Sequence, residues 1–254
     1  MTHPADMGFT IGVLAASGGV GASTLSASLV VRAHTVIDEC GTSVAVDLDP
    51  RGGLDTVLCV EHLDGLRWPD LELRDWAEPG TGRGPTVSDL PGDSQVHVLA
   101  GTGEAIPAWS LVCETLDALT PEAGLVAVDC GPRPHPALLS RLDLLVVVSR
   151  LTAKGAADAA ALARVAPLAR TRTMLVTRGS ARDRSGTALA RQLEIPLLAH
   201  LSDDPAVARQ AAEGLPPGTL RSGVDLVADE VLATVERAWL AMLVGRLGDS
   251  GRSR

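Results

Sequence analysis

Residues 16–24 read Ala-Ser-Gly-Gly-Val-Gly-Ala-Ser-Thr, and this stretch decides the fold. The apolar run 13–15 before it has the character of a strand, and residues 25–30 after it have the character of a helix. Strand, glycine-rich loop and helix in this order form the context of a phosphate-binding loop, whose backbone N–H groups and helix N-terminus hold phosphate oxygens. Such loops carry a lysine before the Ser-Thr pair, and here that position is Ala22. The stretch therefore predicts a bound nucleotide and argues against efficient hydrolysis.

The charge composition limits the partners that the chain can have. The net charge is −9, whereas nucleic acid and anionic lipid attract basic surfaces, so general nucleic-acid binding and an electrostatic lipid anchor are both disfavoured. Lys154 is the only lysine, and arginine supplies nearly all the positive charge. That bias explains arginine in place of lysine, but it does not explain the alanine at position 22.

Cysteine usage and the apolar runs indicate a cytoplasmic protein. The four cysteines form no Cys-x-x-Cys pair and no zinc spacing, which predicts buried, reduced thiols. No basic segment of a signal peptide precedes the first strand, and no apolar run reaches the ~18 residues of a membrane span.

Apolar runs alternate with helical patterns along most of the chain. Because most of these runs are continuous, they predict a doubly wound, mainly parallel α/β sheet of about seven strands with helices on both faces. The predicted strands are Thr10–Ala15, Ser43–Asp47, Gln95–Ala100, Gly124–Asp129, Leu142–Ser149, Thr173–Thr177 and Leu197–Leu201, and the predicted helices are 22–38, 108–119, 152–166, 183–193 and 204–213.

Residues 1–248 are predicted to form a single domain, followed by a frayed end at 249–254. Residues 61–94 are rich in proline and glycine and interrupt the alternation, so they predict an irregular surface with a short helix near Leu71–Trp76. Trp68 and Trp76 there are either anchors for a partner or core residues.

The segment Val224–Val244 carries an apolar stripe at positions 224, 227, 231, 235, 239 and 242, which predicts a last helix. Packing on the sheet is favoured over contact with a membrane, because acidic residues occupy the polar face where interfacial helices carry Lys or Arg.

Three aspartates end predicted strands. Asp47 ends the strand 43–47, Asp49 follows it with i, i+2 spacing, and Asp129 ends a second apolar strand. Ligands of open α/β sheets bind at the carboxyl ends of the strands, so these carboxylates are expected to meet the loop 17–24 at one edge. Each aspartate alone would equally suit a turn or a cap.

With these motifs the chain resembles the MinD/ParA family of deviant Walker P-loop ATPases. The family loop reads Lys-Gly-Gly-x-Gly-Lys-Ser/Thr, and both of its lysines are replaced here, by Ser17 and Ala22. The resemblance also covers Val176-Thr177-Arg178, where the family has an Asn-Arg pair beside the base. It extends to 201–207 with Asp203, similar to a late family segment near the adenine.

The resemblance implies a set of residue roles. ATP would be held by Arg178, Asp203 and the loop, whose residues are Ser17, Gly18, Gly19, Val20, Gly21, Ala22, Ser23 and Thr24. Mg²⁺ would be held by Ser23, Asp47 and Asp129, directly or through water, and Asp49 would orient the attacking water. The family's first lysine crosses the dimer to the partner's phosphates, so a homodimer is expected without that link.

Because its loop lacks the lysine, the chain most resembles the CpaE/TadZ branch. The atypical ATPases of that branch place pilus and Tad-type secretion machinery at the cell pole. The stretch 65–71 further resembles proteins described as septum-site-determining or CpaE-like. The resemblance implies an ATP-binding positioning protein with weak or absent hydrolysis, recruited to pole or septum by division or secretion partners. The alternatives are an interaction scaffold without a nucleotide role and, less favoured, a P-loop synthetase or iron–sulfur reductase.

Overall fold

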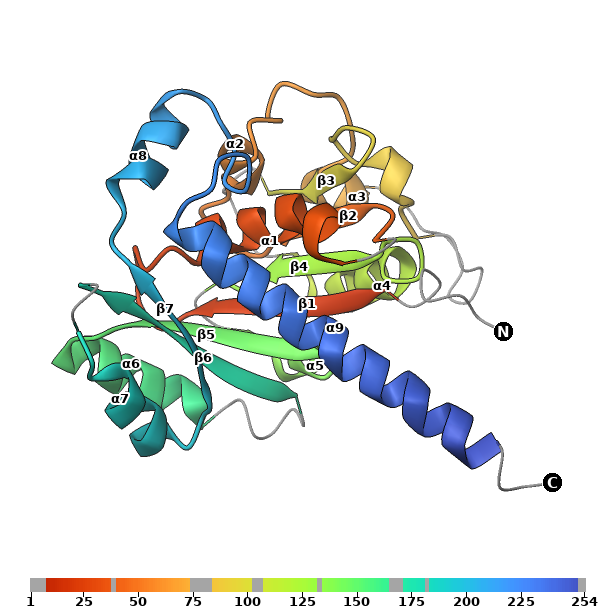
Figure 1. Cartoon of the computed structure of the whole chain (residues 1–254). Coiled ribbons are helices and arrows are strands. Elements are labelled where there is room, and N and C mark those ends of the chain that lie inside the picture. The colour runs from red at the N-terminus through yellow and green to blue at the C-terminus, as the bar shows by residue number, and fades with distance from the viewer. Residues whose placement is uncertain are drawn as a thin grey trace.

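The computed structural model describes residues 8–37, 40–73, 84–101, 107–131, 134–164, 171–180 and 183–250. Its strands form one seven-stranded sheet in the order β3-β2-β4-β1-β5-β6-β7, and every neighbouring pair is parallel (Figure 1). The strands are β1 Phe9–Ala15, β2 Ser43–Asp47, β3 Val96–Leu99, β4 Leu125–Asp129, β5 Leu144–Arg150, β6 Arg172–Gly179 and β7 Leu197–Ser202. The predicted doubly wound parallel sheet is confirmed.

The longer predicted helices are also present. The helices are α1 Ala22–Val36, α2 Leu54–Val57, α3 Trp68–Leu73, α4 Trp109–Leu119, α5 Pro136–Leu139, α6 Ala153–Ala163, α7 Gly186–Leu193, α8 Pro205–Ala212 and α9 Gly223–Ser250, with a 3-10 turn η2 at Val87–Asp89. Helices α2 and α5 were not predicted, because a helix of four residues is too short to show a helical period.

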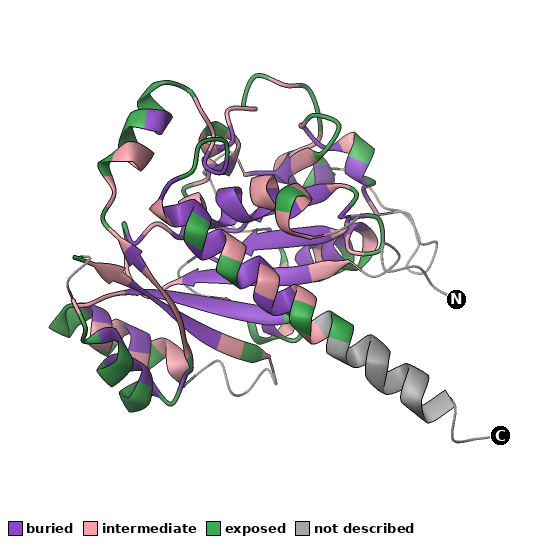
Figure 2. Ribbon diagram, viewed as in Figure 1, coloured by how far each residue is buried: buried purple, intermediate pink, exposed green. Residues whose placement is uncertain are grey.

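Each buried strand faces a helical layer on both sides, which explains its continuous apolar sequence. In β4, Leu125 and Ala127 join a core with α1, α2 and α9, whereas Val126 and Val128 join a second core with α3 to α7. Figure 2 shows the buried central strands between these layers. The sheet is thereby buried on both faces, and its carboxyl edge carries the loop between β1 and α1.

The last helix packs on the protein, as favoured from its sequence. Val224, Val227, Val231 and Val235 are buried in the core shared with α1, and α9 also contacts β7. Within the described residues, no helix is long and apolar enough to cross a membrane. The stripe positions 239 and 242 lie outside the described side chains, as do residues 251–254, whereas α9 itself continues two residues beyond the predicted limit of 248.

Trp68 is a core residue and not a partner anchor. It begins α3, three residues before the predicted start of this helix, and is only 3% exposed. Its indole Nε1 donates a hydrogen bond to the carbonyl oxygen of Asp47 at 2.8 Å, so it braces the end of β2. Trp76 lies outside the described residues.

The cysteines follow the prediction of reduced thiols. All four are free; Cys40, Cys113 and Cys130 are buried, and Cys59 is partly buried. Desolvation raises the pKa of the Cys40 thiol to about 11, so this thiol stays protonated at neutral pH.

Candidate functional site

The loop between β1 and α1 has the backbone of an anion-binding turn. Gly19 and Gly21 adopt left-handed conformations with φ of 71° and 94°, and Gly21 caps the N-terminus of α1. A side chain at Gly18 or Gly19 would meet no atom within 4 Å, so the crest of the loop is open. A left-handed glycine turn leading into a helix N-terminus is a geometry that holds phosphate oxygens.

The loop lines a pocket of about 360 Å³ at the carboxyl edge of the sheet. The pocket brings together the whole predicted loop with Asp49, Asp129 and Arg178 from three other elements. Its lining consists of Ala15, Ala16, Ser17, Gly18, Gly19, Val20, Gly21, Ala22, Ser23, Thr24, Asp49, Arg51, Asp129, Gly131 and Arg178. Two of the three predicted strand-end carboxylates, Asp49 and Asp129, therefore meet the loop in this pocket, whereas Asp47 is not among its lining residues.

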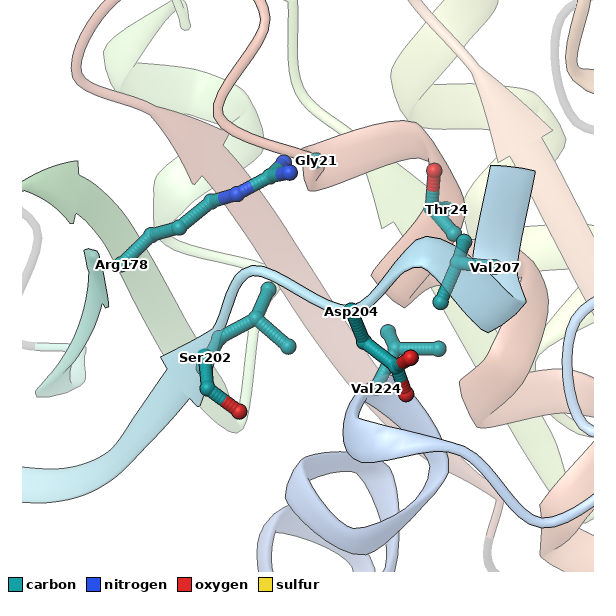
Figure 3. Close-up of a pocket in the computed structure, with 8 residues that line it drawn as sticks. Gly21, Thr24, Arg178, Ser202, Asp204, Val207 and Val224 are labelled. Atoms are coloured by element: carbon teal, nitrogen blue, oxygen red, sulfur yellow. The ribbon is translucent and has the colours of Figure 1, made fainter. Parts of the chain in front are cut away.

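A smaller pocket of about 40 Å³ adjoins the first and shares Gly21, Thr24 and Arg178 with it. Figure 3 shows this pocket, with the Arg178 side chain extending toward Gly21 and with Asp204 and Val224 across from it. The remaining lining comes from the end of β7 and from α8, at Leu201, Ser202 and Val207. The segment predicted to lie near the adenine thus borders the loop, although Asp204 lines the pocket where Asp203 was predicted.

Asp47 and Asp129 lie side by side at the ends of β2 and β4, where they are register partners. Both are 3% exposed. A side-chain hydrogen bond joins Asp129 to Ser23, while the Asp47 carboxylate accepts the backbone N–H groups of Asp49 and Leu54 at 2.9 and 3.0 Å. Asp47 therefore also shapes the turn after β2.

Burial sets the protonation of this pair. Desolvation raises the pKa of Asp47 to about 6, against the lowering effect of its two backbone hydrogen bonds. Desolvation likewise raises the pKa of Asp129, and its hydrogen bond with Ser23 opposes the rise. A nearby cation would favour the charged form of both carboxylates.

Asp49, the predicted water-orienting residue, is held by Arg51. Its carboxylate accepts the Arg51 backbone N–H at 2.9 Å and the guanidinium at 3.0 and 2.6 Å. The hydrogen bond with the Arg51 guanidinium lowers the pKa of Asp49. Arg51 also lines the larger pocket, so a positive charge lies beside the carboxylate at the rim of the site.

The crest of the loop is contacted by two arginines at the ends of neighbouring strands. Arg178 of β6 pairs with Asp203 at 2.9 Å and donates to the carbonyl oxygen of Gly19 at 3.4 Å. Arg150 of β5 donates to the same oxygen at 3.2 Å. Arg150 was not among the predicted site residues, although it directly follows the predicted strand 142–149 and ligands bind at the carboxyl ends of such strands.

The position of the missing lysine carries no cation of its own. Ala22 is 6% exposed and packs in the core at the start of α1. Lys154, the only lysine of the chain, lies on α6 in an ion pair with Asp158. The cations that contact or line this site are therefore arginines.

The donor set suits Mg²⁺ only together with a phosphate ligand. Among the described residues, no three His, Cys, Asp or Glu side chains are grouped to bind a metal ion. Mg²⁺ in nucleotide sites is commonly bound by one or two carboxylates, substrate phosphates and waters. Ser23 beside Asp129, with Asp47 next to it, fits that pattern under a loop whose backbone geometry suits phosphate.

The fold has well-matched relatives among solved structures. The cell division ATPase MinD of Pyrococcus furiosus superposes with a TM-score of 0.70 at 20% identity, covering 91% of this chain and 100% of that one. The ParA family ATPase of Chlorobium tepidum gives 0.69 at 13% identity, covering 89% and 98%. The chain has the MinD/ParA fold. The septum site-determining protein MinD of Pyrococcus horikoshii, complexed with Mg-ADP, gives 0.63 at 17% identity, covering 91% and 97%.

The sequence comparisons add relatives but no family assignment. Uncharacterised proteins from two strains of Mycobacterium tuberculosis, CDC 1551 and H37Rv, are each 30% identical over 249 residues, or 93% of this chain. The chain spans 64% of the length of these relatives. No family model matches the chain.

Proposed function

We propose that this chain is an atypical MinD/ParA-like protein that binds ATP with Mg²⁺ and hydrolyses it weakly or not at all. The observation that carries the proposal is the pocket of about 360 Å³, lined by the complete glycine loop and by Asp49 and Asp129. Its open left-handed crest is suited to a polyphosphate, although position 22 supplies no charge.

In this proposal, different residues bind the phosphates, the Mg²⁺ ion and the base of the nucleotide. The loop 17–24 and the N-terminus of α1 receive the phosphates, and Ser23, Asp129 and Asp47 hold Mg²⁺ directly or through water. Arg178 contacts both the larger pocket and the smaller one beside it, where the base would lie. When bound, Mg²⁺ would supply positive charge next to the phosphate oxygens.

Weak hydrolysis follows from charge placement. Phosphoryl transfer requires positive charge aimed at the transferred group, and Ser17 and Ala22 supply none. Asp49 was predicted to orient water, but its carboxylate is held by Arg51 on both oxygens. Both features support binding without efficient turnover.

For the cellular role, we propose spatial positioning of septum or Tad and pilus secretion machinery by a cytoplasmic homodimer recruited by protein partners. The likeness to solved ATPases of cell division supports this reading at the level of the fold. The assignment to the CpaE/TadZ branch rests on the loop residues 17–24 and on 65–71.

The deciding experiment measures binding and turnover separately. Calorimetric titration with ATP, with and without Mg²⁺, is expected to give saturable binding that Mg²⁺ strengthens. The missing charged hydrogen bond is expected to weaken affinity by roughly ten- to hundredfold relative to a lysine-bearing loop. In a turnover assay, Asp49→Ala distinguishes a trace intrinsic rate from a contaminating ATPase. Robust turnover that this change abolishes would contradict weak hydrolysis.

The alternative is an interaction scaffold without a nucleotide role. It is favoured by the internal partners of the site, because arginines of the chain itself already contact Gly19 and Asp49. Absence of ATP and ADP binding by a correctly folded protein would select the scaffold. A reductase or synthetase has less support, since the cysteines are mostly buried and the loop lysine is missing.

A further inference from the structure

We infer that Arg150 is the cation that substitutes for the missing loop lysine, by holding the loop crest and adding positive charge for the nucleotide phosphates. This inference rests on the proposed nucleotide function, and it names a positioning residue for that site. The residue lies 128 positions after Ala22 in the chain, so only the sheet brings the two regions together.

The position of Arg150 follows from the order of the strands. β5 is the neighbour of β1, and Ala15 pairs with Val148 in the register. The loop begins with a hydrogen bond from the Ala16 N–H to the Val148 carbonyl oxygen at 2.9 Å. Arg150 follows two residues later on β5, and so extends from the strand that supports the start of the loop.

The contact itself concentrates positive charge at the crest. The guanidiniums of Arg150 and Arg178 both donate to the carbonyl oxygen of Gly19, at 3.2 and 3.4 Å. Two like charges at one neutral acceptor repel each other unless an anion compensates them. Asp203 compensates Arg178 at 2.9 Å, whereas none of the ion pairs among the described residues includes Arg150.

The uncompensated charge lies beside an open anion-binding loop. Gly19, which Arg150 contacts, lines the pocket of about 360 Å³, and Gly18 and Gly19 are exposed. Arg150 has no ion-pair partner among the described residues, and in a chain of net charge −9 such a cation next to the pocket bears on what the pocket binds. Phosphate oxygens held by the loop would neutralise it, and the lysine that Arg150 would replace reaches the β- and γ-phosphates, which AMP lacks.

Variants of the full chain test whether Arg150 acts through its positive charge or only through its hydrogen bond to the carbonyl oxygen of Gly19. Arg150→Gln removes the charge and keeps an N–H group that can donate to Gly19, whereas Arg150→Lys keeps the charge. Arg172→Gln is the matched control, because this exposed residue begins β6, at the edge of the sheet opposite the loop. Thermal unfolding of each variant establishes that it folds.

Calorimetric titrations with ATP and with AMP, at low and at high salt, provide the readout. For Arg150→Gln we expect ATP affinity to fall at least about tenfold with a weaker salt dependence, while AMP affinity changes less than about twofold. Arg150→Lys is expected to restore most of the ATP affinity, and Arg172→Gln to match the wild type.

The other outcomes distinguish failure of the inference about Arg150 from failure of the proposed function. If the wild type binds ATP and Arg150→Gln binds it equally well, the inference about Arg150 fails and the proposed function stands. Equal losses for ATP and AMP would show that Arg150 only braces the loop, which also overturns the inference. If the wild type binds neither nucleotide, the proposed function fails and the inference fails with it.

Discussion

At the scale of single residues, the pair of Arg51 and Asp49 is open to a direct test. Because the Arg51 guanidinium lowers the pKa of Asp49, Arg51→Ala is expected to raise that pKa toward its ordinary value of 3.8. A carboxyl-selective NMR titration measures it. Asp93 is the internal control, since its pKa is held down by backbone N–H groups of Val96 and Gln95 and not by an arginine. An unchanged pKa of Asp49 would show that Arg51 does not hold this carboxylate in solution.

The buried Asp47 predicts a pH effect of defined sign. Its pKa is about 6 in the folded protein and 3.8 ordinarily, so the folded state binds more protons between these values. The contribution of Asp47 to stability is therefore full below pH 4 and is lost as pH rises to about 6. The difference between the two pKa values corresponds to about 3 kcal/mol.

Chemical denaturation from pH 4 to 7 is the corresponding measurement. The Asp47→Asn variant is expected to show a less negative slope of unfolding free energy against pH than the wild type. The stabilities of the two proteins are compared at pH 4, because there the Asp47 carboxyl of the folded wild type is mostly protonated and, like the asparagine side chain, uncharged. Parallel pH profiles would contradict the raised pKa of Asp47.

At the scale of elements, the glycine loop allows a matched comparison of two substitutions. A Cβ at Gly18 or at Gly19 meets no atom within 4 Å, but only Gly19 has a left-handed φ, of 71°. We expect Gly19→Ala to cost about 1–2 kcal/mol of unfolding free energy, and Gly18→Ala to cost much less. Urea unfolding of both variants tests this, and equal effects would argue against a left-handed residue at position 19.

The attachment of α9 to α1 depends on a buried carboxylate. Asp225 is 1% exposed and accepts hydrogen bonds from the Ser28 hydroxyl at 2.7 Å and from the N–H and hydroxyl of Ser222, both at 2.8 Å. Asp225→Ala leaves these buried donors unpaired, and we expect a loss of about 2–4 kcal/mol.

Asp229 on the next turn of α9 is the control for this effect. It forms an ion pair with Arg32 at 2.8 Å and is 28% exposed at its side chain, so Asp229→Ala is expected to cost about 1 kcal/mol or less. A larger loss for Asp229→Ala than for Asp225→Ala would contradict the assignment of α9 stability to the buried carboxylate.

At the scale of the whole molecule, self-association is the main prediction. By resemblance we expect a homodimer, or a monomer–dimer equilibrium, with the nucleotide face at the interface. Light scattering over a range of protein concentrations, with and without ATP and Mg²⁺, measures the mass. Only monomer at high concentration under both conditions would contradict the prediction. High salt is expected to change the monomer–dimer equilibrium little, because Ser17 supplies no charge across the interface where the family has a lysine.

The sequence by itself determined the architecture and predicted most of the residues that line the larger pocket. Continuous apolar runs specify strands buried on both faces, and the alternation with helices specifies a parallel sheet. Because the carboxyl ends of parallel strands meet at one edge, the sequence places Asp49 and Asp129 near the loop 17–24, and they line one pocket with it. These inferences succeed because they depend only on the local pattern of apolar residues and on the common direction of parallel strands.

Only the tertiary structure decided what each side chain contacts. The order of the strands places Arg150 beside the loop, and packing places Trp68 under Asp47 and brings Arg51 onto Asp49. Such contacts depend on which strands are neighbours and on which side-chain rotamers the packed helices allow. Neither can be read from the local period of apolar residues in the sequence. The sequence therefore indicates a phosphate-binding edge, while the fold determines which cations serve it.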